Sequence, residues 1–593
     1  MRFHRTMLAA LAASAAFVSA APAFAQAAGE TSAVRDTSCE RPCLIQALEE
    51  HMKALAERDP AKLKLADHVH FTENNVDLKL GEGLWRTVTA VDATGLEAAD
   101  PVTGNAAWFG SVRENGKPAI YAVRIHVKDG RIDEIESVVH RKTALPAPFG
   151  DVTKMVHDPE FNAILPEDQR RPRERMLAIA DGYFDTVELN DGQVNTHFAD
   201  DCSRLENGIS TTAPPPAGAG GNAAAIASGC ENQFKLGIYR INKRVRRHFS
   251  IIDTERGVAV ASGFFDHANE FDHYKLTDGR EMKTALKWPN SITLLEAFRI
   301  KDAQVQKIEA VFTYVPYFMH NPFWGPGSQP PKYKVDPKAC DTVCLGTMAH
   351  EVATGMVNNT WKSVPWASAV GYAENSVGIR VGEGIWATVT AVDQHPLVVA
   401  DASTGKAVWI GRIEEHGQPA WASFTINAAG DRVGGIEALI RRKEYGQPYV
   451  EPASAPSFDV LPAGQRTTRK AMIAGAEAFY KAMNDHASSA PGGIGADCHW
   501  LVNGLDVGAC APAFGNPALK SVERIRDREV LAVDEERGLV VYRTFEDFPA
   551  ATDVDKTYPR TLQVTELFHF VGGKVQQVQA WTSELPYGMK PHD

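Results

Sequence analysis

The sequence lacks the features that define several common classes of protein. Positive charge is in deficit over its 593 residues, because 62 Lys and Arg are outnumbered by 74 Asp and Glu, which gives a net charge of −12. We find no basic stripe with interleaved aromatic residues, so we expect no nucleic-acid partner, and the same negative charge argues against anionic membranes. Beyond the N-terminal region, no apolar run is long enough to span a bilayer.

Motifs for nucleotide cofactors and for serine nucleophiles are also missing. The chain contains no Rossmann fingerprint, no P-loop and no G-x-S-x-G element. The cysteines do not have zinc spacing, because neither C-x-x-x-C pair has a second Cys or His pair nearby. We therefore expect no cofactor and no metal, and a chemistry carried by amino-acid side chains alone.

The N-terminus has the pattern of a secretory signal peptide over residues 1–25. A basic start precedes a short apolar stretch, and Ala23-Phe24-Ala25 forms a small-x-small site, so cleavage is predicted before Gln26. A membrane anchor fits less well, because the apolar run is short and Pro22 interrupts it. We expect a soluble mature protein in the periplasm or outside the cell.

The eight cysteines fall two to each quarter of the chain. In an exported protein, an even and local distribution of this kind predicts disulfide bonds. The predicted pairs are Cys39–Cys43, Cys202–Cys230, Cys340–Cys344 and Cys498–Cys510.

The chain is an internal duplication. Residues of the first quarter recur 301 positions later without a gap, as in Glu73 and Glu374, Trp85 and Trp386, Asp92 and Asp393, and Glu136 and Glu437. Each repeated unit consists of two domains, because the second and fourth quarters share a plan of their own. The predicted domain boundaries are 33–150, 168–326, 335–448 and 462–590.

Each domain begins with a helical pattern and continues with strand-like runs. In the first domain, apolar residues at helical spacing predict a helix over 44–56. The following runs, separated by turn residues, predict strands over 69–76, 84–91, 107–113, 120–127 and 132–139. Helices followed by a meander of strands predict an α+β fold with an antiparallel sheet.

A short motif that contains asparagine recurs once in each domain, as Glu73-Asn74, Glu206-Asn207, Glu374-Asn375 and Val502-Asn503. Helices followed by a bent sheet, with this motif at the end of an early strand, resemble the nuclear transport factor two-like, or SnoaL-like, cone fold. The closer resemblance is to exported tandem-domain proteins of that superfamily, through Cys39-x-x-x-Cys43, Gly81-Glu82-Gly83-Leu84-Trp85 and Phe264-Phe265-Asp266-His267. The resemblance implies four tandem cone-shaped domains, each with helices packed in a bent antiparallel sheet.

The superfamily includes isomerases, dehydratases, epoxide hydrolases, polyketide cyclases and lyases of lignin-derived aromatics, as well as non-catalytic binding modules, so fold alone does not define function. Comparison of domains 2 and 4 is more informative. Glu206, His267 and Glu309 in domain 2 correspond to Val502, Phe548 and Gln579 in domain 4. Carboxylates and an imidazole in an apolar interior suit general acid–base catalysis.

We therefore predict Glu206, His267 and Glu309 as catalytic acids and bases, with Asn207 as a hydrogen-bond donor to a carbonyl or oxyanion. The residues predicted to contact the substrate are Tyr183, Arg204, Asp266, Glu296 and Tyr314. Structural roles remain open for some of them. A Glu-Asn pair at a strand end often bonds to the backbone, and Glu296 recurs as Glu566, which favours a structural role for it.

The function predicted from these observations is that of an exported, cofactor-independent enzyme acting on a small molecule. Its side chains would hydrolyse or eliminate a C–O bond in an aromatic or carbonyl-bearing substrate, with lignin-derived aryl ethers suggested by analogy with related folds. One alternative is a periplasmic protein that binds a ligand without turning it over. Another is a lyase or hydrolase of sugars or uronates. A homodimer is an open alternative to a monomer.

Overall fold

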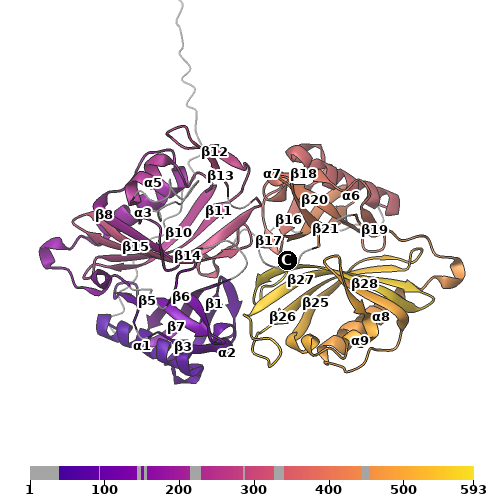
Figure 1. The fold of residues 1–593 in the computed structure, drawn as a ribbon, viewed down its shortest axis with the longest axis horizontal. Helices are drawn as coiled ribbons and strands as arrows, with labels where there is room; N and C mark the ends of the chain where they lie inside the picture. Colours follow the sequence, from indigo (N-terminus) through magenta and orange to yellow (C-terminus); the bar gives the residue numbers. More distant parts are fainter. Residues whose placement is uncertain are drawn as a thin grey trace, which may run out of the picture.

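The fold is described from a computed structural model. It describes residues 39–92, 94–142, 148–152, 157–213, 229–284, 287–325, 340–443, 450–451 and 454–592, so the predicted signal peptide and cleavage site lie outside the described residues. The elements form four domains, with domains 1 and 2 in one half of the molecule and domains 3 and 4 in the other (Figure 1).

Domains 1 and 3 share one plan, which is a long helix beside a seven-stranded sheet. The strand order in domain 1 is β2-β1-β7-β6-β5-β3, with β4 paired to β5, and domain 3 repeats it. The domain 1 elements are α1 (Arg41–Glu57), β1 (Leu65–Glu73), β2 (Val76–Leu78), α2 (Leu84–Thr87), β3 (Val88–Val91), β4 (Leu96–Asp100), β5 (Asn105–Glu114), β6 (Lys117–Lys128) and β7 (Arg131–Arg141). Those of domain 3 are α6 (Thr342–Met356), β16 (Trp366–Glu374), β17 (Val377–Gly378), α7 (Ile385–Thr388), β18 (Val389–Val392), β19 (Leu397–Asp401), β20 (Lys406–Glu415), β21 (Gln418–Ala429) and β22 (Arg432–Arg442).

Domains 2 and 4 each have a six-stranded sheet, in the order β10-β11-β14-β15-β8-β9 for domain 2. The domain 2 elements are α3 (Arg173–Leu189), β8 (Phe198–Glu206), β9 (Ile209–Ser210), α5 (Cys230–Leu236), β10 (Arg244–Asp253), β11 (Val258–His267), β14 (Asn290–Lys301), β15 (Gln304–Val315) and a separate hairpin of β12 (His273–Lys275) and β13 (Glu281–Lys283). Those of domain 4 are α8 (Arg469–Asn484), β23 (Ile494–Val502), β24 (Leu505–Ala509), α9 (Cys510–Ala513), β25 (Arg524–Asp534), β26 (Leu539–Phe548), β27 (Arg560–Val571) and β28 (Lys574–Pro586).

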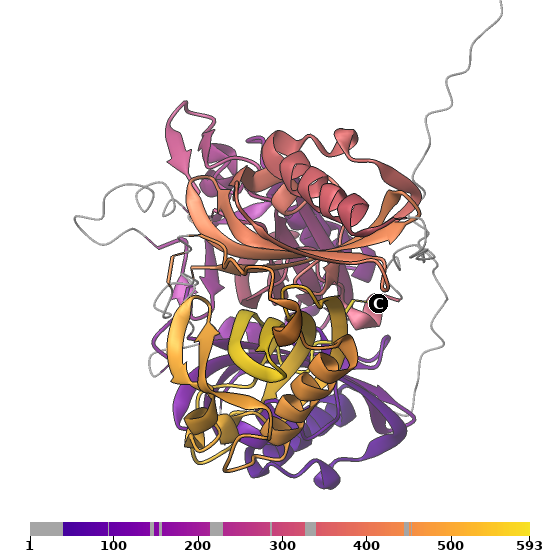
Figure 2. The same cartoon turned by 90° about the vertical axis from the view of Figure 1, so that its right-hand side faces the viewer.

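The sheets pack in pairs, back to back. A shared core joins Phe109, Ile120 and other residues of the domain 1 sheet to Val260 and Leu295 of the domain 2 sheet. Trp421 and Trp581 meet in the same way between domains 3 and 4, with ring centroids 6.0 Å apart. Figure 2 shows α6 on one side of the domain 3 sheet and domain 4 on the other. Each sheet is therefore covered on one face by its helix and on the other by a neighbouring sheet.

The predicted fold of four cones, each with helices packed in a bent antiparallel sheet, is wrong. The described residues are rich in sheet, with 45% in strands and 22% in helices. The sheets of all four domains are mixed, because the first strand of each domain runs parallel to its last. The physical reason lies in strands such as β5, in which almost every residue is buried. Strands buried on both faces need a covering layer on each side, and one helix per domain supplies only one.

Local predictions in domain 1 differ from the structure at three places. The predicted strand over 69–76 ends at Glu73, and the chain turns at Asn74-Asn75 and returns as β2. The predicted strand over 84–91 begins as the helical turn α2, and only Val88–Val91 is extended. The strand β4 was not predicted, because its alanines have low β propensity and gave no alternating pattern.

The recurrent asparagine is part of a two-residue turn that follows the first strand of each domain. Asn74 and Asn75 both have positive φ, as a type I′ hairpin turn requires, and the matching turns begin at Asn207, Asn375 and Asn503. In domain 2 the Asn207 side chain donates to the carbonyl of Phe312 at 3.0 Å and accepts from its N–H at 2.9 Å. The asparagine therefore ties this turn to the last strand of its own domain.

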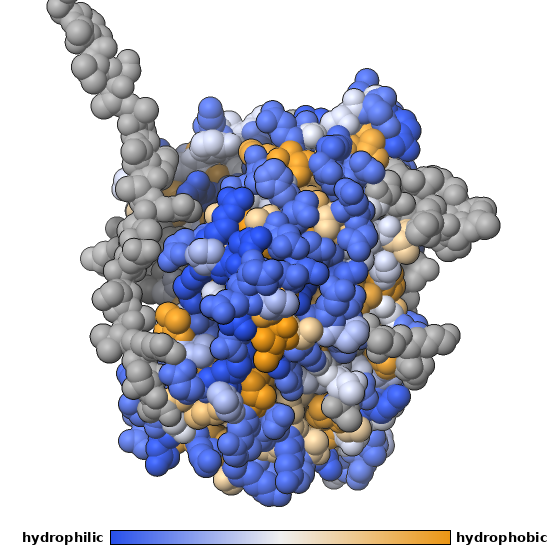
Figure 3. Space-filling view, turned by 90° about the vertical axis from the view of Figure 1, so that its left-hand side faces the viewer, coloured by the Kyte–Doolittle hydropathy of each residue, from blue (hydrophilic) through white to orange (hydrophobic). Residues whose placement is uncertain are grey.

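All four predicted disulfides are present. They are consistent with a secreted protein. In the part of the chain that the structure describes, no helix has the length and apolar character needed to cross a bilayer. The side of the molecule formed by domains 1 and 2 is largely hydrophilic, with scattered apolar residues (Figure 3), as expected when the apolar faces of the sheets cover one another.

Candidate functional site

A row of four residues crosses the inner face of the domain 2 sheet, which is the face toward α3. Neighbouring strands contribute them in the order Glu206, Ala310, Glu296 and Ala261, each the register partner of the next. Strands lie about 4.8 Å apart, so the backbones of the two glutamates are separated by about 10 Å, with only the Ala310 methyl group between them. Two carboxylates thus lie on one face with a small residue between them. We call this set the carboxylate row.

Glu296 is the buried acid of the carboxylate row, at 1% exposure. The Tyr183 hydroxyl donates a hydrogen bond to its Oε1 at 3.0 Å. Its Oε2 is buried and has no hydrogen-bond partner among the described residues. Burial, reinforced by the nearby charge of Glu206, raises the pKa of Glu296 to about 8. Glu296 is therefore mostly protonated at neutral pH and can donate a proton.

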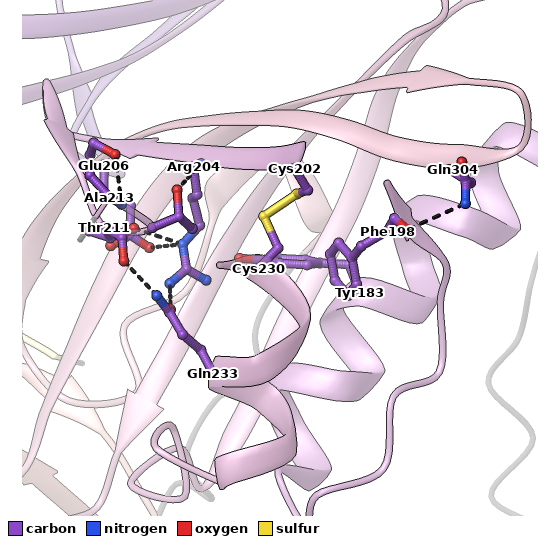
Figure 4. The surroundings of a disulfide bond; sticks show 12 residues. Tyr183, Phe198, Cys202, Arg204, Glu206, Thr211, Ala213, Cys230, Gln233 and Gln304 are labelled. Carbon is purple, nitrogen blue, oxygen red and sulfur yellow. Dashed lines mark hydrogen bonds and ion pairs between the residues drawn. A yellow bond between two sulfur atoms is a disulfide. The ribbon is translucent and has the colours of Figure 1, made fainter. Parts of the chain in front are cut away.

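Glu206 is the more accessible carboxylate, with a side chain 19% exposed, and it is paired with buried Arg204. The Arg204 Nε lies 3.2 Å from Glu206 Oε1 and also donates to Thr211 Oγ1 at 2.9 Å. Arg204 Nη2 donates to Gln233 Oε1 at 2.5 Å (Figure 4). The same nitrogen also donates to the hydroxyl of Tyr239. This network fixes the guanidinium, which in turn holds the Glu206 carboxylate.

The Cys202–Cys230 disulfide builds this network locally. It joins β8, two residues before Arg204, to the first residue of α5 (Figure 4). One helical turn later α5 presents Gln233, whose amide also donates to the Thr211 carbonyl at 2.5 Å. The crosslink therefore determines which face of the short helix meets the arginine.

Four of the predicted site residues, Tyr183, Arg204, Glu206 and Glu296, come together here, and others lie elsewhere. His267 is on the same strand as Ala261 but six residues further on, which is about 20 Å along the strand. Its Nδ1 lies 3.0 Å from Asn290 Oδ1, and burial lowers its pKa.

Asp266 and Glu309 lie on the opposite face of the sheet. Asp266 is fully buried and accepts two hydrogen bonds from Arg246, both at 2.8 Å. Glu309 is on the face toward domain 1, where its Oε1 lies 2.6 Å from His157 Nδ1. Neither carboxylate reaches the carboxylate row.

The two remaining predicted residues have other surroundings. Asn207 uses both its amide donor and its amide acceptor on the backbone of Phe312. Tyr314 is half-buried at the far end of β15, where it lines a cavity between the domains, and burial raises its pKa to about 12.

Domain 4 carries the same row with different residues: Val502, Ala580, Glu566 and Tyr542. The buried acid is retained, since burial and the Glu546 charge raise the pKa of Glu566 to about 8. Trp500 stands in place of Arg204, Val502 in place of Glu206, and Tyr542 fills the position of Ala261. Arg204, Glu206 and Ala261 thus have no counterpart of the same type at the matching positions of domain 4.

Sequence reasoning missed Gln233, Tyr239 and the two alanines of the carboxylate row. The difference between Ala261 and Tyr542 was visible in the comparison of domains 2 and 4, but alanine carries no chemistry and drew no prediction. Within the described residues, no three His, Cys, Asp or Glu side chains gather in a way that could hold a metal ion.

Comparisons with known proteins give little functional information. Residues 169–312 and 465–582, within domains 2 and 4, match a family described as a domain of unknown function (DUF8021). The crystal structure of AclR from Streptomyces galilaeus is similar at 16% identity over 20% of this chain and 90% of AclR, with a TM-score of 0.16. No curated protein matches the chain.

Proposed function

We propose that this protein is an exported, cofactor-independent acid–base enzyme that cleaves a C–O bond in a small aromatic or carbonyl-bearing molecule at the carboxylate row. The observation that supports it most is the pairing of two unlike carboxylates on one sheet face. Glu296 is buried and its pKa is about 8, whereas Glu206 is partly exposed and ion-paired with Arg204. Two carboxyl groups with such different environments suit the roles of acid and base.

Glu296 is the proton donor in this proposal. The Tyr183 hydroxyl occupies Oε1 as a donor, so the carboxyl proton resides on Oε2. That oxygen is buried and has no hydrogen-bond partner among the described residues, so its proton is not used by the protein itself. Tyr183 is thus a positioning residue, which selects the oxygen that carries the proton.

Glu206 is the base. In hydrolysis it takes a proton from water, the water oxygen bonds to the substrate carbon, and the C–O bond breaks as the departing oxygen takes the Glu296 proton. In elimination, Glu206 removes a C–H proton next to a carbonyl, the electron pair forms a C=C bond, and the same departing oxygen is protonated. In both routes Glu206 ends protonated and Glu296 ionised, so a return of the proton through water resets the site.

Aromatic side chains support an aromatic substrate. Tyr239 is half-buried beside Arg204, with the guanidinium carbon 5.0 Å from its ring centroid. Phe265 is also half-buried and packs against Phe184, with centroids 6.1 Å apart. Such side chains favour offset or edge contacts with another ring.

The test is turnover by the mature protein in heavy-oxygen water, without added cofactor, followed by mass spectrometry. The substrates are ketone-bearing aryl ethers, including lignin-derived ones, and uronate glycosides. Cleavage with label in the product indicates hydrolysis, and cleavage without label indicates elimination. Cleavage of the glycosides alone would replace the aryl-ether proposal with the carbohydrate one, and binding without cleavage of any substrate would favour a binding protein.

Matched variants assign the activity to domain 2. Glu296→Gln removes the donor without changing shape, and Glu206→Gln removes the base. Each should lower kcat by a hundredfold or more, on the order expected for loss of a general acid or base. Glu566→Gln, the same change at the matching position of domain 4, should leave kcat within about twofold, because a change confined to another domain removes none of these groups. Equal losses in Glu296→Gln and Glu566→Gln would refute the assignment.

Export through a cleaved signal peptide is part of the same proposal. The four disulfides support it. The N-terminal sequence of protein recovered from the periplasm or the medium should begin at Gln26. A full-length chain that starts at Met1 in the cytoplasm would contradict it.

A further inference from the structure

A cavity of about 210 Å³ lies where all four domains meet. Domain 1 contributes Glu73 and Arg141, and domain 3 contributes the matching pair Glu374 and Arg442. Domains 2 and 4 contribute the turns and strand ends that include Tyr317 and Tyr587. The internal duplication has therefore built this cavity from two similar walls. We call it the central cavity.

The two walls differ at six matched positions, and three of these differences are not conservative. Trp288, Asn290 and Tyr314 of domain 2 correspond to Tyr558, Arg560 and Glu584 of domain 4, all 270 residues later. The difference of greatest chemical consequence is the arginine. It introduces a cation on one side of the central cavity where the other side has an amide.

Carboxylates of the central cavity are already engaged by the protein. Glu73 accepts from Arg141 Nη2 at 2.7 Å and from the Leu84 N–H at 2.7 Å. Glu374 accepts from the Ile385 N–H at 2.6 Å. Glu73 and Glu374 thus hold the short helices α2 and α7 in place and serve the fold. The third carboxylate of the lining, Glu584, accepts from the Tyr558 hydroxyl at 2.9 Å.

Some hydrogen-bond donors that line the central cavity have no acceptor within the described part of the chain. Within the described residues, every hydrogen bond of Arg560 uses Nη1, with Asp555 Oδ2 at 3.0 Å and Thr557 Oγ1 at 2.8 Å among the acceptors. Its guanidinium lies 4.6 Å from the Phe548 ring centroid, which fixes the plane of the group. The Nε and Nη2 donors, and the Tyr314 hydroxyl across the central cavity, make no hydrogen bond within the described part of the chain. A fixed guanidinium with two unused parallel donors matches the geometry of a carboxylate.

We propose that the central cavity binds a small carboxylate attached to a single ring. The carboxylate would pair with Nε and Nη2 of Arg560, and the ring would lie among the aromatic side chains Trp288, Tyr314 and Tyr587. The volume suits such a ligand, because 210 Å³ corresponds to about seven water molecules at about 30 Å³ each. Aromatic acids and uronates both carry a carboxylate on a single ring. The inference does not depend on the proposed function, since the central cavity and the carboxylate row use different residues.

The test is calorimetric titration of the full mature protein with benzoate and, separately, with glucuronate. Saturable binding of one equivalent supports the proposal, and the acid that binds identifies the source as aromatic or sugar-derived. Benzamide, which keeps the ring but lacks the charge, should bind at least about tenfold more weakly than benzoate if benzoate is the ligand, and glucuronamide should do so for glucuronate. This comparison uses the unaltered protein and so does not depend on the folding of a variant.

Arg560→Asn introduces the residue that domain 2 carries at the matching position. It should weaken binding of the acid by about tenfold or more, whereas Arg280→Asn, on the exposed β12–β13 hairpin, should leave it unchanged. Circular dichroism confirms that both variants fold. The proposal is overturned if neither acid binds saturably, if the neutral amide binds as tightly as its acid, or if folded Arg560→Asn binds as the unaltered protein does.

Discussion

Replacement of Glu296 by glutamine should stabilise the protein at alkaline pH and leave it unchanged at acid pH. The glutamine has the same shape and still accepts the hydrogen bond from Tyr183, but it remains neutral at every pH. The carboxyl group of Glu296 has an ordinary pKa of 4.5 in the unfolded chain and about 8 in the fold. A group with a raised pKa keeps its proton in the fold after the unfolded chain has released it.

The sign and size of the effect follow from this difference. Below pH 4.5 the Glu296 carboxyl group is protonated in both the folded and the unfolded protein, so it does not lower the free energy of unfolding. Between pH 4.5 and 8 unfolding releases a proton, so the free energy of unfolding falls by about 1.4 kcal/mol per pH unit, to a total of about 5 kcal/mol. Above pH 8 both states are ionised and the loss is complete. Glu296→Gln avoids this loss, so its advantage over the native protein should grow from about zero at pH 4 to a few kcal/mol at pH 8.

The assay is thermal unfolding followed by circular dichroism at pH values from 4 to 9. For a domain of this size, each kcal/mol shifts Tm by roughly 2–4 °C, so the variant should exceed the native protein by roughly 10 °C at pH 8. Glu566→Gln should show the same gain in Tm with rising pH, because the pKa of Glu566 is also about 8. Glu281→Gln on the exposed strand β13 serves as the control, and its Tm difference from the native protein should stay constant from pH 4 to 9. A Tm difference for Glu296→Gln that stays constant over this pH range would refute the reasoning.

Two further changes test the supports of the site. Replacing both Cys202 and Cys230 by serine removes a crosslink that closes a loop of 28 residues, so we expect a loss of roughly 3–4 kcal/mol and a lower Tm under oxidising conditions, with no difference after reduction. Asn207→Ala removes two hydrogen bonds to Phe312, and alanine tolerates the positive φ of this turn less well than asparagine does. The free energy of unfolding, measured with urea, should therefore fall by roughly 2–3 kcal/mol. A substitution to alanine that left the urea midpoint unchanged would show that the turn does not anchor the strand.

Part of the candidate site could be identified from sequence because an internal comparison was possible. Glu206 was singled out when its counterpart proved to be Val502, and Arg204 and Glu296 were named with it as substrate contacts. Glu309 was selected by the same comparison, yet it lies on the opposite face of the sheet with His157. One residue of register separates it from Ala310, and a sequence without strand pairings does not define which of two adjacent residues faces inward.

The fold prediction failed for a related reason. The helical and strand patterns were read one element at a time, and a pattern of this kind does not say what covers the second face of a sheet. Phe109 and Leu295 are both fully buried, each on the sheet of a different domain, and only their place in one shared core shows that the sheets stack in pairs. The parallel pairing of β8 with β15 was equally invisible, because it joins segments about 100 residues apart.

The sequence alone determined the duplication and the four disulfides, because these depend on order along the chain and on cysteines close in sequence. Tertiary structure decided which glutamates share a face, which of them is buried, and where a cavity forms among four domains. The reason is physical. The pKa of a carboxyl group and the shape of a cavity depend on atoms brought near by long-range packing, and a linear pattern does not specify those neighbours.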